Sequence, residues 1–202
     1  MQRTIARPQP RPSREQVRAR IIAKADELFR ARGYEKTTIA TIAEELDMST
    51  SNIYKFFASK NAVIEAAAEQ SIEDLRSTVL LAAHDRGTAL ERIENITLAI
   101  VESHRRRFEN EVNLYELIIM ANAKKWGCVR RWKSTLRDII AQLIEDGIRT
   151  GEFRSGDTSQ SAEIILDSLM VFLHPLFLSE WTPAEMERRA RAHVKFIGRA
   201  LQ

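Results

Sequence analysis

The sequence has few of the residues that interrupt helices or cross-link chains. Its 202 residues include one cysteine, Cys128, so a disulfide framework is excluded and we expect a reducing, cytoplasmic setting. No uncharged apolar run approaches the roughly 18 residues that would span a bilayer. The N-terminus also lacks the apolar stretch of a secretion signal. We therefore expect no contact with a membrane and no export.

Glycine and proline are scarce, at 7 and 5 residues, and no proline occurs between Ser13 and His174. This long segment is rich in Ala, Leu, Ile, Glu and Arg, which favour helix. No stretch shows the strict apolar and polar alternation of a half-buried strand. The sequence predicts an all-α fold of about nine helices.

Positive charge is concentrated in the first third of the chain. Residues 1–60 carry 12 Lys and Arg against 7 Asp and Glu, whereas residues 61–202 carry 19 against 21. A basic module of this kind is typical of a protein that binds a polyanion, although a solvated surface with an accidental excess is the alternative. Residues 1–12 hold three arginines, three prolines and no acid, which indicates a poorly ordered arm. The arm either lies along nucleic acid or is an idle tail.

Three helix starts follow one another closely after this arm. Ser13 and Gln16 form a capping-box pattern before a helix at about 14–32, which Gly33 should end. Thr37 or Thr38 caps a short second helix, and Ser49 caps a short third one after a tight turn. Two short helices on a longer one predict a helix-turn-helix, whose second short helix enters the DNA major groove.

The exposed residues at the start of this third helix suit base and phosphate recognition. Thr50, Ser51, Asn52 and Lys55 all carry small or cationic hydrogen-bonding groups. The hydroxyl of Tyr54 could reach a phosphate; the alternative for Tyr54 is a half-buried packing role.

An ordered set of residues at these positions resembles the DNA-binding module of the tetracycline-repressor (TetR) family of bacterial regulators. The resemblance covers about residues 15–75. The residues that carry it are Leu28-Phe29, Gly33-Tyr34, Thr37-Thr38-Ile39, Ile42-Ala43, Ser49, Ile53-Tyr54, Phe57 and Ser59-Lys60.

The resemblance implies a role for each matching residue. Thr38 and Lys60 would contact phosphate, and Thr50, Ser51 and Asn52 would meet the base edges with Tyr54 and Lys55 beside them. No catalytic residue, metal or cofactor is implied. Two departures stand out: Leu46-Asp47 replaces the usual small residue and glycine of the turn, and Phe56 replaces a His or Tyr. A phenyl ring cannot donate a hydrogen bond to phosphate.

Further helices are expected after this module, at about 60–83, 88–108, 112–123, 124–149, 158–178 and 183–201. The helix at 158–178 is apolar nearly all round, so it should be covered on more than one side. The resemblance implies a homodimer through the last two helices of each chain. Such a dimer would read a palindromic operator with half-sites about one DNA turn apart.

The resemblance also implies a pocket for a small-molecule effector of unknown identity. Candidate lining residues are His104, Trp126 and Phe172, together with Phe108, Tyr115, Cys128 and His174, although each could equally be a core or interface residue. The expected organisation is an arm at 1–12, a DNA-binding domain at 13–60 that continues to about 75, and an effector-binding and dimerisation domain at 61–202. The predicted function is a transcriptional regulator, a repressor that an effector releases from its operator.

Two other functions are weighed against this one. A small all-α enzyme finds little support, because the four histidines have no metal-binding spacing and no nucleophile-elbow, P-loop or dinucleotide motif is present. A helical protein-interaction module would use the basic region against an acidic partner. That module would show no preference for palindromic DNA over random duplex.

Overall fold

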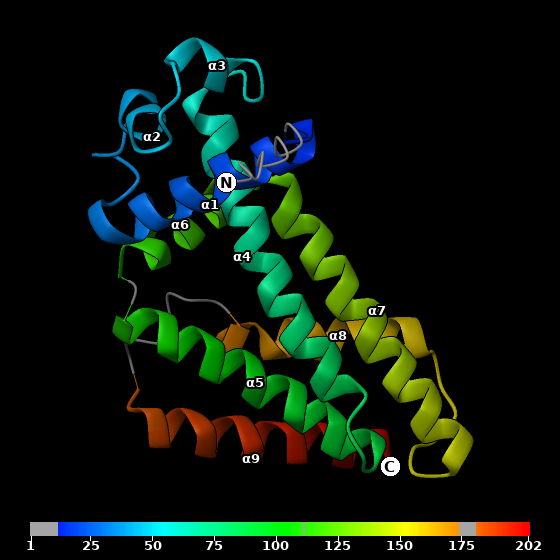
Figure 1. Cartoon of the computed structure of the whole chain (residues 1–202). Coiled ribbons are helices and arrows are strands. Elements are labelled where there is room, and N and C mark those ends of the chain that lie inside the picture. Colours follow the sequence, from blue (N-terminus) through cyan, green and yellow to red (C-terminus); the bar gives the residue numbers. More distant parts are fainter. Residues whose placement is uncertain (1–11, 111, 174–180) are drawn as a thin grey trace, which may run out of the picture. The chain divides into compact units, whose positions relative to one another are not determined.

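A computed structural model describes residues 12–110, 112–173 and 181–202, without the side chains of 107–110, 112, 114, 115, 117, 118 and 173. Within these ranges the chain forms nine helices and no strand, which confirms the all-α prediction (Figure 1). The helices are α1 (Arg14–Arg32), α2 (Ile39–Glu45), α3 (Thr50–Tyr54), α4 (Lys60–Ala83), α5 (Ala89–Asn110), α6 (Val112–Ala123), α7 (Gly127–Thr150), α8 (Thr158–Leu173) and α9 (Pro183–Leu201).

The chain divides into two compact units. Unit 1 ends at Ala67 and unit 2 runs from Ala68 to Gln202, so the single helix α4 contributes to both. Unit 1 holds α1, α2, α3 and the first two turns of α4. Its core is formed by apolar side chains from all four helices, among them Ile21, Phe29, Ile42, Ile53 and Val63.

Unit 2 has one hydrophobic core between α4, α5, α7, α8 and α9. The core residues of α5 include Ile93, Ile96 and Ile100, whose spacing places them on one helical face. Helix α5 packs along α9, and α7 packs along α8. This arrangement covers the inner face of each helix and leaves the outer faces of α8 and α9 open to solvent.

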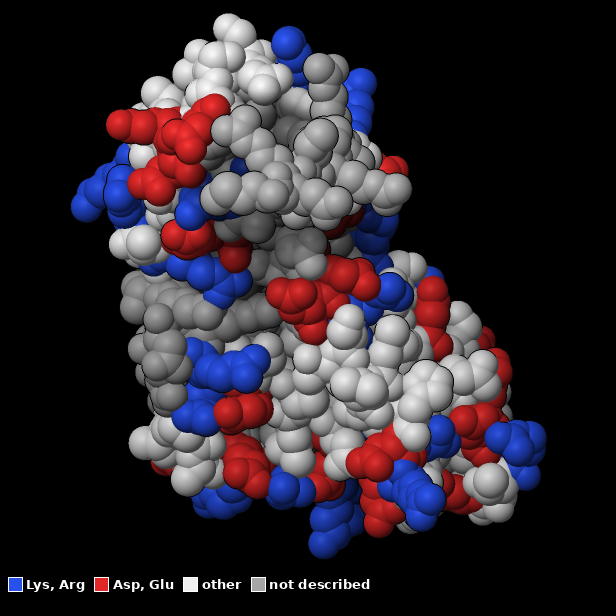
Figure 2. Space-filling view, in the orientation of Figure 1, with Lys and Arg blue, Asp and Glu red and all other residues white. Residues whose placement is uncertain are grey.

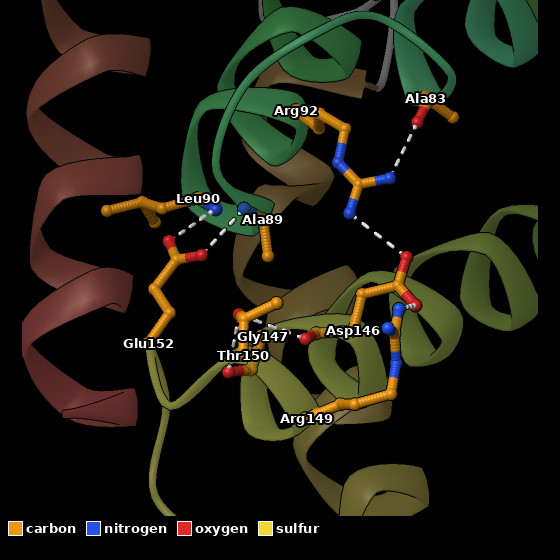
Figure 3. A network of polar contacts seen from close by, with 9 residues as sticks. All are labelled: Ala83, Ala89, Leu90, Arg92, Asp146, Gly147, Arg149, Thr150 and Glu152. Carbon is orange, nitrogen blue, oxygen red and sulfur yellow. Dashed lines mark hydrogen bonds and ion pairs between the residues drawn. The ribbon is translucent and has the colours of Figure 1, made fainter.

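A polar network joins the end of α4, the start of α5 and the end of α7 in unit 2 (Figure 3), and Arg92 reaches α4 by donating to the Ala83 carbonyl at 3.4 Å. The Glu152 carboxylate accepts the backbone N–H groups of Ala89 and Leu90, at 2.7 and 2.9 Å, and so satisfies the start of α5. Arg92 of α5 pairs with Asp146 of α7 at 3.0 Å, and Arg149 pairs with the same carboxylate at 2.9 Å. The network therefore fixes the start of α5 to the end of α7.

Most predicted helix limits are confirmed, one is wrong, and one lies outside the described residues. Helix α7 begins at Gly127 rather than at about residue 124. The reason is that Lys125 takes a positive φ of 51° and Trp126 is extended, which breaks the helix after α6. Helix α8 is described to Leu173; the remaining residues predicted for it, Pro175 included, lie outside the described residues.

Candidate nucleic-acid interface

Helix α2 begins with a cap that the sequence leaves open between two threonines. The Thr38 hydroxyl accepts the N–H of Thr41 at 3.1 Å, so Thr38 is the cap. Thr37 is fully buried, and its hydroxyl donates to the carbonyl of Gly33 at 2.8 Å. The two threonines therefore have different roles. Thr37 bonds the loop to the end of α1, and Thr38 caps α2 while its side chain stays exposed.

The turn between α2 and α3 has Asp47 where related proteins usually have glycine. Asp47 adopts a left-handed φ of 53°, a conformation that Asp tolerates better than most non-glycine residues. The N–H of Met48 bonds to the carbonyl of Ala43 at 2.8 Å, and that of Asp47 bonds to Glu44 at 3.1 Å. These two bonds form a Schellman motif, which ends α2 and sets the direction in which α3 begins.

Helix α3 is held on one face and open on the other. The Ser49 hydroxyl accepts the N–H of Asn52 at 3.2 Å and caps the helix. Ile53 is fully buried in the core of unit 1. The remaining predicted contact residues are placed around the outer face: Thr50, Ser51, Tyr54 and Lys55 are exposed, and Asn52 is half-buried.

Lys60 occupies the first position of α4, after Ser59, whose hydroxyl accepts the N–H of Ala62 at 3.2 Å. The Lys60 ammonium donates to the backbone carbonyl of Glu35 at 3.1 Å. Lys60 is therefore tied to the loop before α2 in the free protein. The Lys55 ammonium, in contrast, makes no ion pair or hydrogen bond with any part of the chain that the structure describes.

Positive charge is not concentrated on α3 itself. Three of the 12 cationic residues of segment 1–60 lie in residues 1–11, outside the described residues. Acidic side chains gather over α2, where Glu44, Glu45 and Asp47 are exposed (Figure 2). The exposed face of α3 itself is polar and carries one cationic side chain, Lys55. Such a face suits hydrogen bonding to bases better than long-range attraction of the DNA phosphates.

The sequence does not predict the contacts of two arginines that lie near α3. Arg14 and Arg18 of α1 lie over the rings of Phe56 and Phe57, which follow α3. Phe56 is half-buried and Phe57 is buried. The sequence signal is weak, because arginines four residues apart on a helix usually form a solvated face.

The effector-pocket candidates lie on three different elements of unit 2. His104 is buried on α5, Trp126 is half-buried at the start of α7, and Phe172 is buried on α8, where its ring meets that of His193 at 5.4 Å. Cys128 is buried on α7. The side chains of Phe108, Tyr115 and His174 lie outside the described residues.

The described residues offer no cluster of three or more His, Cys, Asp or Glu that could hold a metal ion. Among the same residues, no helix is both long enough and apolar enough to cross a membrane.

Comparisons with known proteins match both units. Residues 21–67 match the family described as bacterial regulatory proteins, tetR family, and residues 89–194 match the tetracyclin repressor-like, C-terminal domain. The chain is 22% identical over 153 residues to the HTH-type transcriptional regulator UidR of Escherichia coli, which covers 74% of this chain and 76% of that protein.

Solved structures show the same fold. A TetR-family transcriptional regulator from Pectobacterium atrosepticum superposes with a TM-score of 0.75 at 19% identity, over 94% of this chain and 97% of that chain. A transcriptional regulator from Cytophaga hutchinsonii has a TM-score of 0.68 at 19% identity, over 90% and 96% of the two chains. Because the second family match alone spans more than half of the sequence, this chain belongs to the TetR family of bacterial DNA-binding transcriptional regulators.

Proposed function

We propose that the protein binds a palindromic DNA operator as a homodimer and leaves it when a small-molecule effector binds. The exposed, polar outer face of α3 carries this proposal, because it sits on a helix whose other face is locked into the core by Ile53. Thr50, Ser51 and Asn52 would meet base edges, with Tyr54 and Lys55 beside them. Thr38 and Lys60 would contact phosphates at the starts of α2 and α4.

We further propose that residues 13–60, continuing to about 75, form the DNA-binding domain. Residues 61–202 would then form the domain for effector binding and dimerisation. This division keeps α4 common to both functions, so a shift of α4 could carry a signal from one to the other. A 10- to 100-fold loss of operator affinity needs a coupling free energy of only about 1.4 to 2.7 kcal/mol.

The outer face of α8 and α9 supports the homodimer. Ile164 of α8 is 61% exposed and Phe196 of α9 is 69% exposed, which is unusual for large apolar side chains. Both border an apolar groove of about 280 Å³ between the two helices. A second copy of the chain would cover this surface by the same residues in two-fold symmetry.

Selection of bound duplexes from a random pool tests the DNA-binding proposal. We expect recovery of an approximate palindrome, bound roughly 10³-fold or more tightly than random duplex at physiological salt. A protein-interaction module would enrich no sequence, and that result would overturn the proposal.

A thermal-shift screen of small molecules tests the effector. Because a ligand that binds the folded state alone raises its stability by about 2.7 kcal/mol at 100 times Kd, a true effector should raise the unfolding temperature. It should also release the selected operator. Variants of His104, Trp126 and Phe172 then show whether these residues line its pocket.

A further inference from the structure

Two arginines of α1 lie against the segment that ends α3. Arg14 and Arg18 are four residues apart and so share one face of α1. The guanidinium carbon of Arg14 is 5.7 Å from the ring centre of Phe56, and that of Arg18 is 5.0 Å from the ring centre of Phe57. Arg14 also donates a hydrogen bond to the backbone carbonyl of Lys55 at 3.3 Å.

The place of Arg14 is unfavourable within its own helix. It is the first residue of α1, where the helix dipole is positive and repels a cation. Lys55 is the C-cap residue of α3, so its carbonyl lies at the negative end of that helix dipole. Backbone carbonyls at this end lack partners within the helix. The attraction between Arg14 and the end of α3 therefore offsets the repulsion within α1.

Helix α3 needs such support because it is five residues long. An isolated helix in water is marginal below about 12 to 15 residues. Its first turn is secured by Ser49 and by burial of Ile53. Its last turn depends on the N–H groups of Phe56 and Phe57, which both bond to the Ile53 carbonyl at 2.9 and 3.1 Å.

We propose that Arg14 is a positioning residue for DNA reading. It fixes the C-terminal end of α3, and through it the direction in which Tyr54 and Lys55 are presented. The Phe56 ring lies within cation–π distance of the guanidinium, which gives a role to a ring that cannot bind phosphate. This inference rests on the proposed function, in which α3 reads the operator.

The full-length variants Arg14→Gln and Arg14→Lys test this role, with Arg20→Gln as the matched control. Arg20 is an exposed arginine of the same helix that makes no ion pair, hydrogen bond or ring contact within the described residues. Amide hydrogen exchange at Phe56 and Phe57 reports the end of α3 directly. Affinities for the selected operator and for a random duplex are measured between about 50 and 200 mM salt.

We expect Arg14→Gln to speed exchange at Phe56 and Phe57 by about three- to tenfold and to lower operator affinity by a similar factor. Random-duplex affinity and the salt slope should match those of Arg20→Gln. Arg14→Lys should not restore the operator affinity, because the compact ammonium group of lysine does not match the planar guanidinium, which contacts the Phe56 ring and donates to the Lys55 carbonyl at once.

Three results would overturn the inference. Unchanged exchange at Phe56 and Phe57 would show that Arg14 does not hold α3. Equal losses on both duplexes, with a salt slope smaller by about one and rescue by Arg14→Lys, would show a phosphate contact instead. If the wild-type protein binds no DNA sequence more tightly than random duplex, the proposed function is wrong, and so is the role of Arg14 in DNA reading. The exchange rates at Phe56 and Phe57 then still show whether Arg14 stabilises α3.

Discussion

Ile53 and Tyr54 are consecutive residues of α3, yet Ile53 is fully buried and Tyr54 is 52% exposed. Because the buried neighbour fixes the helix in the core of unit 1, about half of the Tyr54 side chain is held out in solvent. The stability that Ile53 contributes and the recognition role proposed for Tyr54 can therefore be tested independently.

Tyr54→Ala should weaken operator binding by about 5- to 30-fold, the loss expected for one hydrogen bond or apolar base contact. The far-ultraviolet circular dichroism and the unfolding temperature should stay near wild type, since exposed substitutions usually change stability by less than about 0.5 kcal/mol. Tyr54→Phe separates the hydroxyl from the ring. Ile53→Ala is the contrasting control and should destabilise the fold by about 2 to 5 kcal/mol. Unchanged affinity of Tyr54→Ala at physiological salt would refute the assigned contact.

Lys60→Gln should reduce the steepness with which log affinity falls against log salt, by about 0.9 for one lost phosphate contact. Its affinity for operator and for random duplex should fall together, because phosphate contacts carry no sequence information. Lys195→Gln, at an exposed position of α9, makes the same change of charge outside unit 1 and should leave the slope as it is. Equal slopes for wild type and Lys60→Gln would remove Lys60 from the interface.

Ile164→Glu or Phe196→Glu should convert the proposed homodimer to monomers, because each places a charge in the apolar surface that a second copy would cover. Light scattering after size exclusion measures the change, and operator affinity should fall with it. Leu81→Glu is the matched control: Leu81 is 78% exposed, but it lies on α4 and does not border the α8–α9 groove. Dimers that persist in both groove variants would place the interface elsewhere.

Asp146 should make the fold sensitive to acid. Hydrogen bonds from Arg149 and then from Arg92 hold the pKa of Asp146 below its ordinary value of 3.8. A carboxylate with a lowered folded-state pKa stabilises the fold above the unfolded value and loses that contribution as the pH falls through the folded value. Wild type should therefore lose stability below about pH 4, and Asp146→Asn should lose less over the same range.

Thermal unfolding between about pH 3 and 7 measures this difference. Asp138→Asn is the control, since the Asp138 carboxylate is an exposed group that pairs with its neighbour Arg137 on the same helix. That variant should follow the wild-type curve. A wild-type curve that coincides with that of Asp146→Asn throughout would contradict the prediction.

Local sequence accounts for much of the fold. The caps at Ser13 and Ser49 and the helix stop at Gly33 lie where the sequence predicts them. Each depends on a side chain and a backbone group only a few residues apart, so no knowledge of distant neighbours is needed. The helical periodicity of α5 is predictable for the same reason.

The break before α7 and the choice of Thr38 over Thr37 as cap were not decided by local pattern. Thr37 and Thr38 are equally good caps by residue type, and burial of Thr37 against Gly33 and Leu28 separates them. At the start of α7, Trp126 caps the helix without any side-chain hydrogen bond, so no sequence signal marks the boundary.

The sequence by itself determined the class of protein, the helices and the choice of candidate DNA-contacting residues, because these follow from periodicity, caps and the order of a short motif. Tertiary structure alone decided how those residues are held: Arg14 meets the carbonyl of Lys55 across 41 positions of sequence, and Glu152 meets the start of α5 across more than 60. Contacts of this kind depend on where the packed helices bring distant groups within about 3 Å of one another, and no local pattern in the chain encodes that distance.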